Sequence, residues 1–509
     1  MAGKNLAALL ETLSPVLVSC SHEENFPSSL HGVTSHSGKV EKDDLFCAVE
    51  GASADGHDYI PQALERGAKV IVHTHAEDLP GNVTGIRVRD SHFAWALCCA
   101  FFCGSPGEKL DLYAVTGTNG KTSIAFMTKK LLELGKGEKT GLVSTVEYDC
   151  GAANSLREGV RTTPDAMLLQ EFFGEMVKNH CKNCVMEASS HGLHQHRMGN
   201  VRYAGAIFTN LTGDHLDYHG TMEAYFQAKK LLFTEHVREN APCVINGDDP
   251  WGKRLAEELK EAKKQGSFPG KVIVLSRNDP EAEAFFRVQN LSAAGGAFTL
   301  SCQGKEYEIH SRLIGLHNLY NTAQAFLLAV SAGTDGKKAI QILEEENIAP
   351  PGRLESFSLP SGAHAFVDYA HTDDALARVL EALAPLKGKG RLITLFGCGG
   401  DRDRTKRPRM ALAASELSDV VMVTSDNPRT EEPRAIMEEI EKGFPASFPY
   451  MAEPDRRKAI EKVLARAEKG DIVLLAGKGH ENYQEIKGVR HHFDDREEVK
   501  RFIAEHGKG

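Results

Sequence analysis

The sequence predicts an α/β fold of three domains: a small N-terminal α/β domain, a central phosphate-loop domain with a mostly parallel sheet, and a C-terminal Rossmann-like α/β domain. Two observations predict this fold. Short apolar runs alternate with segments of helical periodicity, which is typical of parallel sheets covered by helices on both faces. One apolar run also leads through a glycine-rich loop into a helix, at residues 112–134. A chain of 509 residues has room for three domains, which we assign to residues 1–109, 110–349 and 350–509.

The first domain is predicted from three strands and one helix. The strands are expected at residues 44–49, 68–73 and 84–88, and the helix at residues 59–67. Polar loops flank the first of these strands and suit the binding of a ligand. The domain carries no catalytic constellation of its own.

The central and C-terminal domains repeat the alternation of strands and helices. After the phosphate loop, strands are expected at residues 183–188, 204–210, 242–246 and 271–275, and helices at residues 168–177 and 222–233. Residues 284–314 are expected to form an appended antiparallel hairpin. The C-terminal strands are expected at residues 364–369, 391–396, 419–424 and 471–476.

Composition and charge exclude several classes of protein. The net charge of −10 gives no basic footprint for nucleic acid. No secretory signal opens the sequence, and its most apolar stretch, residues 93–102, is too short to span a bilayer. The 11 cysteines suit a reducing compartment. We therefore predict a cytoplasmic protein without membrane insertion or a nucleic-acid partner, and we expect a monomer.

The segment after the first central strand has the residues of a phosphate-binding loop. Its glycines allow backbone N–H groups to approach phosphate oxygens, and the following helix N-terminus contributes a favourable dipole. Lys121 supplies charge toward the terminal phosphates, and the Thr122 hydroxyl can bind Mg²⁺. The loop is shorter than the common G-x-x-x-x-G-K-[ST], because Val115 stands where that pattern begins with glycine. We predict an ATP site formed by Gly117, Thr118, Asn119, Gly120, Lys121 and Thr122.

Polar residues at the ends of central strands are candidates for a Mg²⁺ site. Glu187 ends one predicted strand and His215 follows the next. Because open α/β sheets bind ligands outside the carboxyl ends of their strands, both are expected near Thr122 and the phosphates. Mg²⁺ prefers oxygen ligands, which makes Glu187 the stronger candidate and His215 the weaker one.

Zinc chemistry is the rival interpretation of the central domain. It would use residues of one histidine-rich region: His191, His194, His196, Asp214, His215, Asp217 and His219. The spacing H-x-x-H-x-H is not a common zinc pattern, and a phosphate loop upstream favours phosphate contacts. The lone C-x-x-C of Cys181 and Cys184 is weak evidence for zinc, so we interpret both cysteines as flanking a buried strand.

Three loops after C-terminal strands are predicted to bind an anionic substrate. Gly397–Gly400 lacks the last glycine of a dinucleotide fingerprint, and the basic residues after it favour an anion instead; they are Arg402, Arg404, Lys406 and Arg407. Arg429 offers a planar fork for a carboxylate, and Glu481 can receive an ammonium group. A solvated basic loop and an Asx turn with a surface arginine are the structural alternatives for the first two loops.

These motifs, taken in order, resemble the Mur ligases, the ATP-dependent amide-forming enzymes of peptidoglycan synthesis. The resemblance covers essentially the whole chain, through G-T-N-G-K-T, E-A-S-S-H-G-L, N-L-T-G-D-H-L-D-Y-H-G, G-x-H-N-x-x-N, G-R-L-E, D-Y-A-H, G-C-G-G-D-R-D and D-N-P-R. It implies ATP and Mg²⁺ as cofactors and UDP-MurNAc-L-Ala-D-Glu as a substrate. D-N-P-R is the pattern of members that add meso-diaminopimelate through an acyl-phosphate intermediate.

The resemblance also implies roles for individual residues. The catalytic set is Lys121, Glu187, His215 and Lys229, of which Lys229 matches a lysine that the family carbamylates into an anionic metal ligand beside Thr122. Contacts to the UDP-MurNAc-dipeptide are implied for Ser37, Thr162, Thr163, Ser189, Gln195 and Arg197, and for the uridine-side loop Ala52–Ala54. The nucleotide site gains Asn318 near the base, Arg353, and Asp368 near the ribose. The diaminopimelate pocket comprises Arg402, Asp426, Asn427, Pro428, Arg429, Gly477 and Glu481.

Selectivity for the amino acid is expected to rest on Arg429 and Glu481. Meso-diaminopimelate carries a carboxylate beside its distal ammonium group, whereas lysine ends in the ammonium group alone. We expect Arg429 to pair with that carboxylate and to stay unpaired when lysine binds, which penalises lysine.

Two departures from the family pattern stand in the sequence. His371-Thr372-Asp373-Asp374 replaces the usual H-T-P-D, which is expected to move only a helix start. Ser35-His36-Ser37 replaces D-S-R on the uridine side and weakens the assignment of uridine contacts.

Four alternatives remain beside the diaminopimelate-adding ligase. A lysine-adding ligase and a folylpolyglutamate synthase are of the same class, and the separate N-terminal domain and D-N-P-R disfavour the synthase. A phosphate-loop switch ATPase would hydrolyse ATP without an amine. A nucleotide-binding structural module would tolerate Lys121→Ala.

Overall fold

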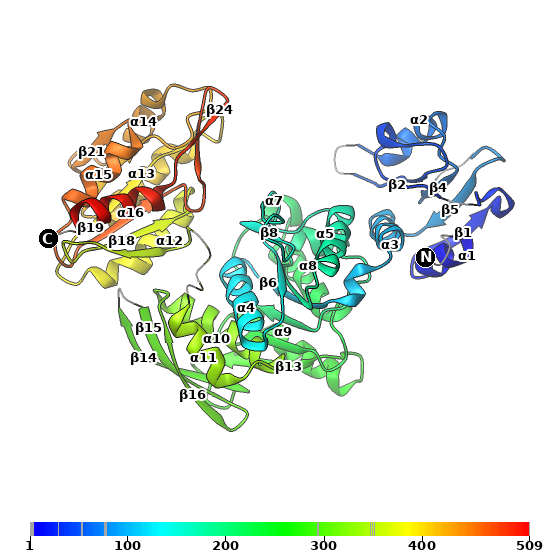
Figure 1. Ribbon diagram of the computed structural model, residues 1–509, viewed down its shortest axis with the longest axis horizontal. Coiled ribbons are helices and arrows are strands. Elements are labelled where there is room, and N and C mark those ends of the chain that lie inside the picture. The colour runs from blue at the N-terminus through cyan, green and yellow to red at the C-terminus, as the bar shows by residue number, and fades with distance from the viewer. Residues whose placement is uncertain are drawn as a thin grey trace. The chain divides into compact units, whose positions relative to one another are not determined.

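The computed structural model describes residues 5–28, 30–51, 54–75, 79–292, 295–346, 348, 350 and 352–507 (Figure 1). The chain separates into two compact units, Met1–Ala284 with Gln324–Ala339, and Phe285–Ala323 with Ile340–Gly509. The three-domain division proposed from the sequence stays a prediction. In the uridine-side loop, Ala52 and Ser53 lie outside the described residues.

The N-terminal part of the first unit is built on a five-stranded sheet. Its strands are β1 (Leu17–Ser21), β2 (Val33–Thr34), β3 (Leu45–Cys47), β4 (Val70–His73) and β5 (Thr84–Val88). Its helices are α1 (Leu6–Leu13), α2 (Ile60–Glu65) and α3 (Ser91–Cys103), with 3₁₀ turns at Glu23–Asn25, Ser37–Lys39, Gly56–Tyr59 and Pro106–Lys109. The strand order is β1-β5-β4-β3-β2, parallel except that β1 runs antiparallel to β5. Strands β3, β4 and β5 and helix α2 confirm the predicted elements.

The apolar stretch at residues 93–102 forms α3. Asp90 caps this helix, since its side chain accepts a hydrogen bond from Phe93 N–H at 2.8 Å. None of the helices in the described part of the chain is long and apolar enough to cross a membrane.

The rest of the first unit carries the central sheet. Its strands are β6 (Asp111–Thr116), β7 (Thr140–Val143), β8 (Glu147–Asp149), β9 (Arg157–Glu158), β10 (Asn183–Glu187), β11 (Gly205–Phe208), β12 (Pro242–Asn246) and β13 (Lys271–Ser276). Its helices are α4 (Lys121–Lys136), α5 (Ala166–Lys178), α6 (Ser190–His194), α7 (Leu216–His219), α8 (Met222–Glu235) and α9 (Pro250–Lys264). The strand order is β13-β12-β11-β6-β10-β7-β8-β9, parallel from β13 to β7.

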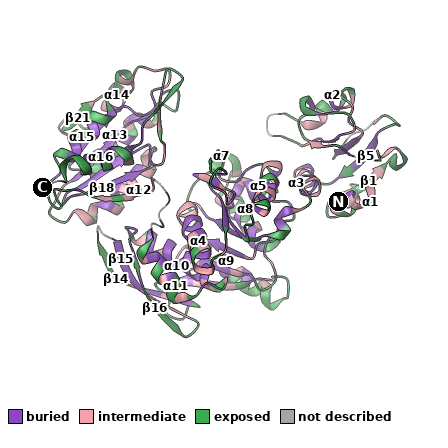
Figure 2. Cartoon of the chain, in the orientation of Figure 1, coloured by how far each residue is buried: buried purple, intermediate pink, exposed green. Residues whose placement is uncertain are grey.

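Strand β6 lies in the middle of this sheet, between β10 and β11. All its residues after Asp111 are buried, and Figure 2 draws buried residues in purple. The parallel register pairs Glu187 with Val115 and Phe208 with Thr116. The segments that follow β6, β10 and β11 therefore meet at one edge of the sheet, where α/β folds bind ligands.

The two cysteines of the C-x-x-C pair belong to the core of this sheet. Cys184 on β10 is fully buried, and Cys181 just before it is 5% exposed. Both are free thiols, and burial raises the pKa of Cys181 to about 11. Their interpretation as flanking a buried strand is confirmed.

The second unit contains a six-stranded sheet and two smaller groups of strands. The strands are β14 (Ala284–Ser292), β15 (Gly295–Cys302), β16 (Lys305–Ser311), β17 (Glu355–Ser358), β18 (His364–Asp368), β19 (Leu392–Phe396), β20 (Val420–Thr424), β21 (Tyr450–Glu453), β22 (Ile472–Ala476), β23 (Tyr483–Ile486) and β24 (Val489–His492). The helices are α12 (Asp373–Leu383), α13 (Lys406–Leu417), α14 (Pro433–Glu441), α15 (Arg456–Ala465) and α16 (Asp495–His506), with a 3₁₀ turn at Ala384–Lys387. The chain passes between the units after Ala284 in β14, and again within α10 (Leu316–Ser331) and α11 (Gly336–Glu345).

The main sheet of the second unit has the order β17-β18-β22-β19-β20-β21. It is parallel from β18 to β21, and β17 is an antiparallel edge strand. Strands β18, β19, β20 and β22 confirm the four predicted strands. The predicted hairpin at residues 284–314 contains three strands, β14, β15 and β16. Helix α12 begins at Asp373 after its N-cap Thr372, so the H-T-D-D segment starts a helix as expected.

Candidate functional site

The phosphate loop joins β6 to α4. Gly117 (φ +141°) and Gly120 (φ +88°) adopt backbone conformations that favour glycine. A Cβ atom on Gly117 would lie 1.9 Å from Thr209 Oγ1. Helix α4 begins at Lys121, directly after the loop, so its N-terminal N–H groups are available to an anion.

The segment after β11 holds the loop in place. Thr118 N–H donates to Asn210 O at 2.8 Å, and Asn119 N–H donates to Asn210 Oδ1 at 3.0 Å. The Thr209 hydroxyl donates to Asn119 O at 2.6 Å. Sequence reasoning missed Thr209 and Asn210 as loop partners. One feature of the sequence could have indicated them: the motif N-L-T-G-D-H begins just after the strand that became β11.

Replacing Gly117 by alanine is expected to lower the free energy of unfolding by about 1–3 kcal/mol, the usual cost of a strained backbone conformation. It is also expected to weaken ATP binding, since the new Cβ atom and Thr209 cannot both keep their positions. Urea unfolding and calorimetric titration with an ATP analogue measure the two effects. Gly174→Ala in α5 is the matched control, because an added Cβ meets no atom within 4 Å there. Equal stability and equal ATP affinity of both variants would contradict the prediction.

Two lysines converge on the carbonyl oxygen of Gly117. Lys121 Nζ donates to Gly117 O at 3.0 Å and to Thr118 O at 2.8 Å. Lys229 Nζ on α8 donates to Gly117 O at 2.8 Å, and its side chain is buried. Burial, followed by the charge of Lys121, holds the pKa of Lys229 well below its usual value. The structure therefore brings together two of the four predicted catalytic residues and favours a neutral amine on Lys229.

Glu187, at the end of β10, is a fully buried carboxylate. Its Oε1 accepts a hydrogen bond from Thr145 N–H at 2.9 Å, and its Oε2 lies 3.2 Å from the Thr145 hydroxyl. The same hydroxyl lies 3.0 Å from Thr162 Oγ1. The pairing of Glu187 with Val115 places this carboxylate at the entrance of the phosphate loop, and Thr122 is the second residue of the helix that follows. No motif indicated Thr145.

His215 lies in a cluster of imidazole and phenol rings. Its ring stands edge-on to that of His191, with centroids 4.9 Å apart, and its Nε2 is 3.5 Å from Asp214 Oδ2. His191 also lies 4.2 Å from the ring centroid of Tyr218. Burial lowers the pKa of His219, in the same cluster, to about 4. His215 is about half exposed, and its role as a Mg²⁺ ligand stays a prediction.

Residues predicted to contact the UDP-MurNAc-dipeptide lie next to Glu187. The Thr163 hydroxyl donates to Glu187 O at 2.8 Å and accepts from Ser189 N–H at 2.9 Å. Arg197 donates to Thr163 O and to Gln195 Oε1, both at 2.7 Å. Four residues of the predicted group, Thr163, Ser189, Gln195 and Arg197, therefore form one hydrogen-bonded network at the end of β10.

Ser37, the predicted contact at the uridine end, lies in the N-terminal part of the unit. Its hydroxyl donates to Gln62 Oε1 on α2 at 2.6 Å. His36 Nδ1 accepts from Gly38 N–H at 3.1 Å and caps the 3₁₀ turn. The unusual Ser35-His36-Ser37 segment thus forms a capped turn, and its contact with uridine stays a prediction.

The remaining nucleotide-site residues have structural partners in the described chain. Both carboxylate oxygens of Asp368, at the end of β18, accept main-chain N–H bonds of 2.8 Å. Burial raises the pKa of Asp368. The Arg353 guanidinium lies 5.2 Å from the ring centroid of Tyr369. Asn318, near the start of α10, donates from Nδ2 to Ile314 O at 2.8 Å. These contacts do not test the predicted roles of the three residues in ATP binding, which stay predictions.

In the second unit, the loop after β20 connects two other strand-end loops. Asn427 Nδ2 donates to Glu481 Oε2 at 2.8 Å. Gly400 N–H donates to Asn427 O at 2.9 Å, and Arg429 donates to Gly400 O at 2.7 Å. The structure thus brings together residues from all three loops that the sequence singled out.

The other residues of the predicted pocket differ in their surroundings. Gly477 (φ +114°) faces Asp426, since a Cβ atom on it would lie 2.6 Å from Asp426 Oδ2. Pro428 O accepts from Glu431 N–H at 3.0 Å. Arg402 is exposed.

Two partners in this region were missed by sequence reasoning. Lys478 is fully buried, and its Nζ donates to Glu481 Oε2 at 3.1 Å and to Asn427 Oδ1 at 3.3 Å. Glu485 Oε2 lies 3.5 Å from Arg429 Nε. The expectation that Arg429 stays unpaired without a ligand carboxylate is therefore wrong, because a main-chain carbonyl and Glu485 already face its N–H groups.

Three of the basic residues after Gly397–Gly400 form ion pairs or hydrogen bonds with other residues of the protein. Arg407 is fully buried and pairs with Glu431 at 2.8 Å and with Glu439 at 2.7 Å. Arg404 also pairs with Glu439. Lys406 donates to a main-chain carbonyl at 2.8 Å. The interpretation of this run as an anion site is wrong for Arg404 and Arg407, whose charges are balanced by carboxylates.

Comparison with known proteins identifies the family. Three Mur ligase family models match: "Mur ligase family, catalytic domain" over residues 29–96, "Mur ligase middle domain" over residues 115–329, and "Mur ligase, glutamate ligase domain" over residues 352–479. Each match lies inside one of the three domains predicted from the sequence.

Curated relatives match over nearly the full chain. A protein of Clostridium tetani, named UDP-N-acetylmuramoyl-L-alanyl-D-glutamate–2,6-diaminopimelate ligase, is 39% identical over 94% of this chain and 96% of its own. A protein of the same name from Fusobacterium nucleatum is 40% identical over 94% of this chain and 95% of its own. A solved structure of a ligase of that name is 32% identical, with a TM-score of 0.71, and covers 97% of this chain and 100% of its own. This chain belongs to the Mur ligase family.

Proposed function

We propose that this chain is an ATP-dependent ligase that joins meso-diaminopimelate to UDP-MurNAc-L-Ala-D-Glu. The observation that carries the proposal is the connected group of loops around Asn427, which offers the guanidinium of Arg429 and the carboxylate of Glu481. Meso-diaminopimelate presents a carboxylate and an ammonium group side by side, which complement these two charges. The names of relatives that are 39% and 40% identical support the same substrate.

The proposal assigns one substrate to each domain. Residues 1–109 bind the UDP end, residues 110–349 bind ATP, and residues 350–509 bind the amino acid. The network of Thr163, Ser189 and Arg197 is assigned to the peptide end of the UDP-substrate, next to the phosphate loop.

The residues at the phosphate loop fit a Mg²⁺ ion. Thr122 offers a hydroxyl, and the buried carboxylate of Glu187 gains from a cation that offsets its desolvation. A Mg²⁺ ion held there would neutralise charge that develops during phosphoryl transfer. Lys229 as it stands offers no oxygen ligand to the ion, and if protonated it would add a second positive charge beside Lys121 on the same carbonyl.

Carbamylation of Lys229 removes this conflict. The neutral amine attacks the carbon of CO₂, an N–C bond forms, and one proton is released. Burial supplies the neutral amine that this step requires. The product carries an anionic oxygen ligand in place of the neutral amine, and we propose that Lys229 acts in this form.

The proposed reaction has two steps. The D-glutamyl carboxylate attacks the γ-phosphorus of ATP and displaces ADP, while Lys121 and the loop N–H groups stabilise the charge on the transferred phosphoryl group. The amino group of meso-diaminopimelate then attacks the acyl carbon, and phosphate leaves. Asn427 and Glu481 orient the amino acid, and buried Lys478 fixes the position of Glu481.

Phosphate release with ATP, Mg²⁺ and UDP-MurNAc-L-Ala-D-Glu tests the function, with meso-diaminopimelate or L-lysine added in parallel. Release that requires meso-diaminopimelate supports the proposal. Release that requires lysine would keep the family and overturn the substrate. The contacts of Arg429 with Gly400 O and Glu485 make this lysine outcome the specific alternative, since they reduce the penalty against lysine. Release without either amine would favour a switch ATPase.

A further inference from the structure

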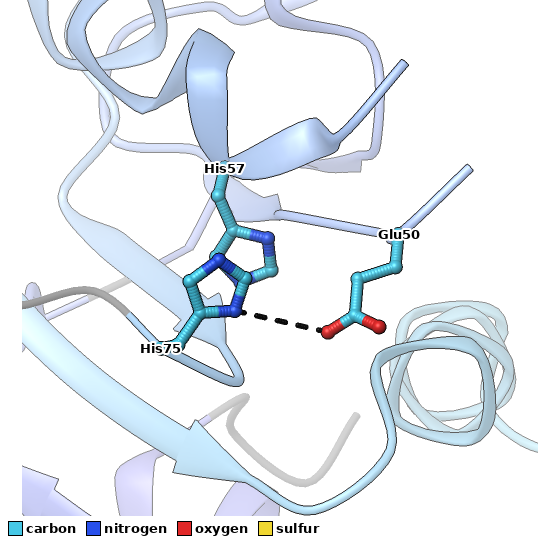
Figure 3. A group of neighbouring side chains, drawn as sticks. All are labelled: Glu50, His57 and His75. Atoms are coloured by element: carbon cyan, nitrogen blue, oxygen red, sulfur yellow. Dashed lines mark ion pairs between the residues drawn. The ribbon is translucent and has the colours of Figure 1, made fainter. Parts of the chain in front are cut away.

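Three side chains that commonly bind metals converge in the N-terminal part of the first unit (Figure 3). Glu50 follows β3, His57 lies in the 3₁₀ turn Gly56–Tyr59, and His75 follows β4. One ligand atom from each residue lies within 4.8 Å of the other two. Among the described residues, this is the group with such spacing, and the proposed ligase reaction uses none of its members.

The carboxylate of Asp55 lies beside both imidazole rings. His57 Nδ1 lies 2.6 Å from Asp55 Oδ1, and His75 Nε2 lies 3.6 Å from Asp55 Oδ2. The shorter contact is a hydrogen bond, which leaves the lone pair of His57 on Nε2. His75 Nδ1 is the nitrogen that faces Glu50, 3.8 Å from its Oε1. Carboxylates hold the histidine ligands of metal sites through hydrogen bonds of the kind that His57 makes.

These two nitrogens and Glu50 face the same point. Thr74 Oγ1 lies 2.5 Å from Glu50 Oε1, 2.9 Å from His75 Nδ1 and 3.3 Å from His57 Nε2. Thr74 N–H also donates to His57 Nε2 at 3.0 Å. The hydroxyl has one proton to donate, so Glu50 and His75 share a single donor on this side. The point where the three ligand atoms converge is therefore rich in acceptors, and Arg87 Nε donates to Thr74 O beside it at 3.1 Å.

The two imidazole rings are stacked against each other. The centroids of His57 and His75 are 3.9 Å apart, and the ring planes differ by 23°. This packing holds the two side chains together beside Glu50.

We propose that Glu50, His57 and His75 bind one divalent transition-metal ion of the Zn²⁺ class. Two imidazole nitrogens and one carboxylate form a zinc ligand set that leaves a fourth position open, and imidazole favours Zn²⁺, Ni²⁺ or Cu²⁺ over Mg²⁺. His75 Nδ1 and Glu50 Oε1 are 3.8 Å apart. Tetrahedral ligands about 2.0–2.1 Å from zinc are separated by roughly 3.4 Å, so a small side-chain movement closes the site. The Thr74 hydroxyl turns aside, and the ion replaces the N–H bond to His57 Nε2.

The bound ion has a structural consequence. Glu50 and Asp55 form a β-bridge at the base of the loop between them, and Gly51 N–H donates to Ala54 O at 3.0 Å. Coordination by Glu50 and His75 would fix the base of this loop, at Glu50 and Asp55, to the end of β4. The loop base and the strand end would then unfold together.

Calorimetric titration of the full chain with Zn²⁺, in buffer containing excess Mg²⁺, tests the proposal. Wild type is expected to bind one Zn²⁺ that His75→Ala and Glu50→Gln do not bind. Asp55→Asn is expected to weaken this binding by about 10- to 100-fold, the usual effect of removing a carboxylate behind a histidine ligand. The melting temperature gives a second readout, since Zn²⁺ should raise it in wild type and not in His75→Ala.

His31→Ala is the matched control, because His31 is an exposed histidine just before β2, and its Nδ1 lies 3.3 Å from a main-chain carbonyl, Lys42 O. This variant should keep the site. Side chains of Glu50 and His75 are more than half exposed, so their replacement leaves the core intact. Zn²⁺ titrations of His75→Ala and Glu50→Gln that match wild type would overturn the proposal, as would the absence of binding in wild type.

Discussion

Replacement of Lys229 by alanine is expected to lower kcat by about 100- to 1,000-fold, with a smaller change in the KM for ATP. Removal of one pre-organised electrostatic group from a reaction centre has effects of this size. In the structure Lys229 is buried against the Gly117 carbonyl, within the phosphate loop. As a carbamate it would supply an anionic ligand that alanine cannot replace.

The carbamate also predicts a dependence on CO₂ and pH. CO₂ reacts with the neutral amine, so the carbamylated fraction falls as pH falls and protons occupy Nζ. Because burial lowers the pKa of Lys229, the neutral amine persists at lower pH than for an exposed lysine. Protein kept free of CO₂ at mildly acid pH should lose activity and regain it with bicarbonate. Carbon-13 NMR of protein equilibrated with labelled bicarbonate measures the carbamate directly.

Lys230 provides the matched control. It is the next residue on α8, but its Nζ lies 2.7 Å from Glu258 Oε2. Lys230→Ala should keep kcat within about twofold, because a partly exposed ion pair contributes little. Loss of activity in Lys230→Ala together with an active Lys229→Ala would show that the carbamylated position was assigned to the wrong lysine.

The strands that the sequence located best are buried on both faces. Strands β19 and β22 lie within the predicted residues 391–396 and 471–476, because a strand covered on both sides is a nearly continuous apolar run. The edge strands β17 and β21 were not predicted. Their residues alternate between partly exposed and exposed, so no apolar run marks them.

The sequence predicted which residues at strand ends belong to the candidate site. It did not predict which residues contact one another there. Motifs nominated Glu187 and Arg429, since their residue types have a chemical use at those positions. Thr145 and Lys478 have no motif, and their importance arises only where strands distant in sequence become neighbours. The same reason explains the error at Arg407, whose partners lie more than 20 residues further along the chain.

Replacement of Arg429 by alanine is expected to lower kcat/KM for meso-diaminopimelate by about 100-fold. Truncating one member of a buried charge pair typically costs about 2–5 kcal/mol. We place the effect in the lower part of this range, because Arg429 must exchange existing partners for the substrate. Its guanidinium bonds to Gly400 O at 2.7 Å and faces Glu485 at 3.5 Å.

The effect should be specific to the distal carboxylate. Turnover of L-lysine, which lacks this group, should change by less than about fivefold in Arg429→Ala. Arg429→Lys keeps the charge but loses the planar fork, so it should fall between the alanine variant and wild type. Steady-state kinetics with both amino acids, at saturating ATP and UDP-substrate, separate these outcomes.

The preformed contacts of Arg429 also predict the behaviour of its partner. Glu485→Gln removes the carboxylate that competes with the substrate for Arg429, so the KM for meso-diaminopimelate should fall or stay unchanged. Arg434→Ala is the control for a general loss of positive charge, since Arg434 is exposed on α14 and pairs with Glu438. An equal loss of kcat/KM for both amino acids in Arg429→Ala would contradict the prediction. It would mean that Arg429 stabilises the loop through its hydrogen bond to Gly400 O and does not bind the distal carboxylate.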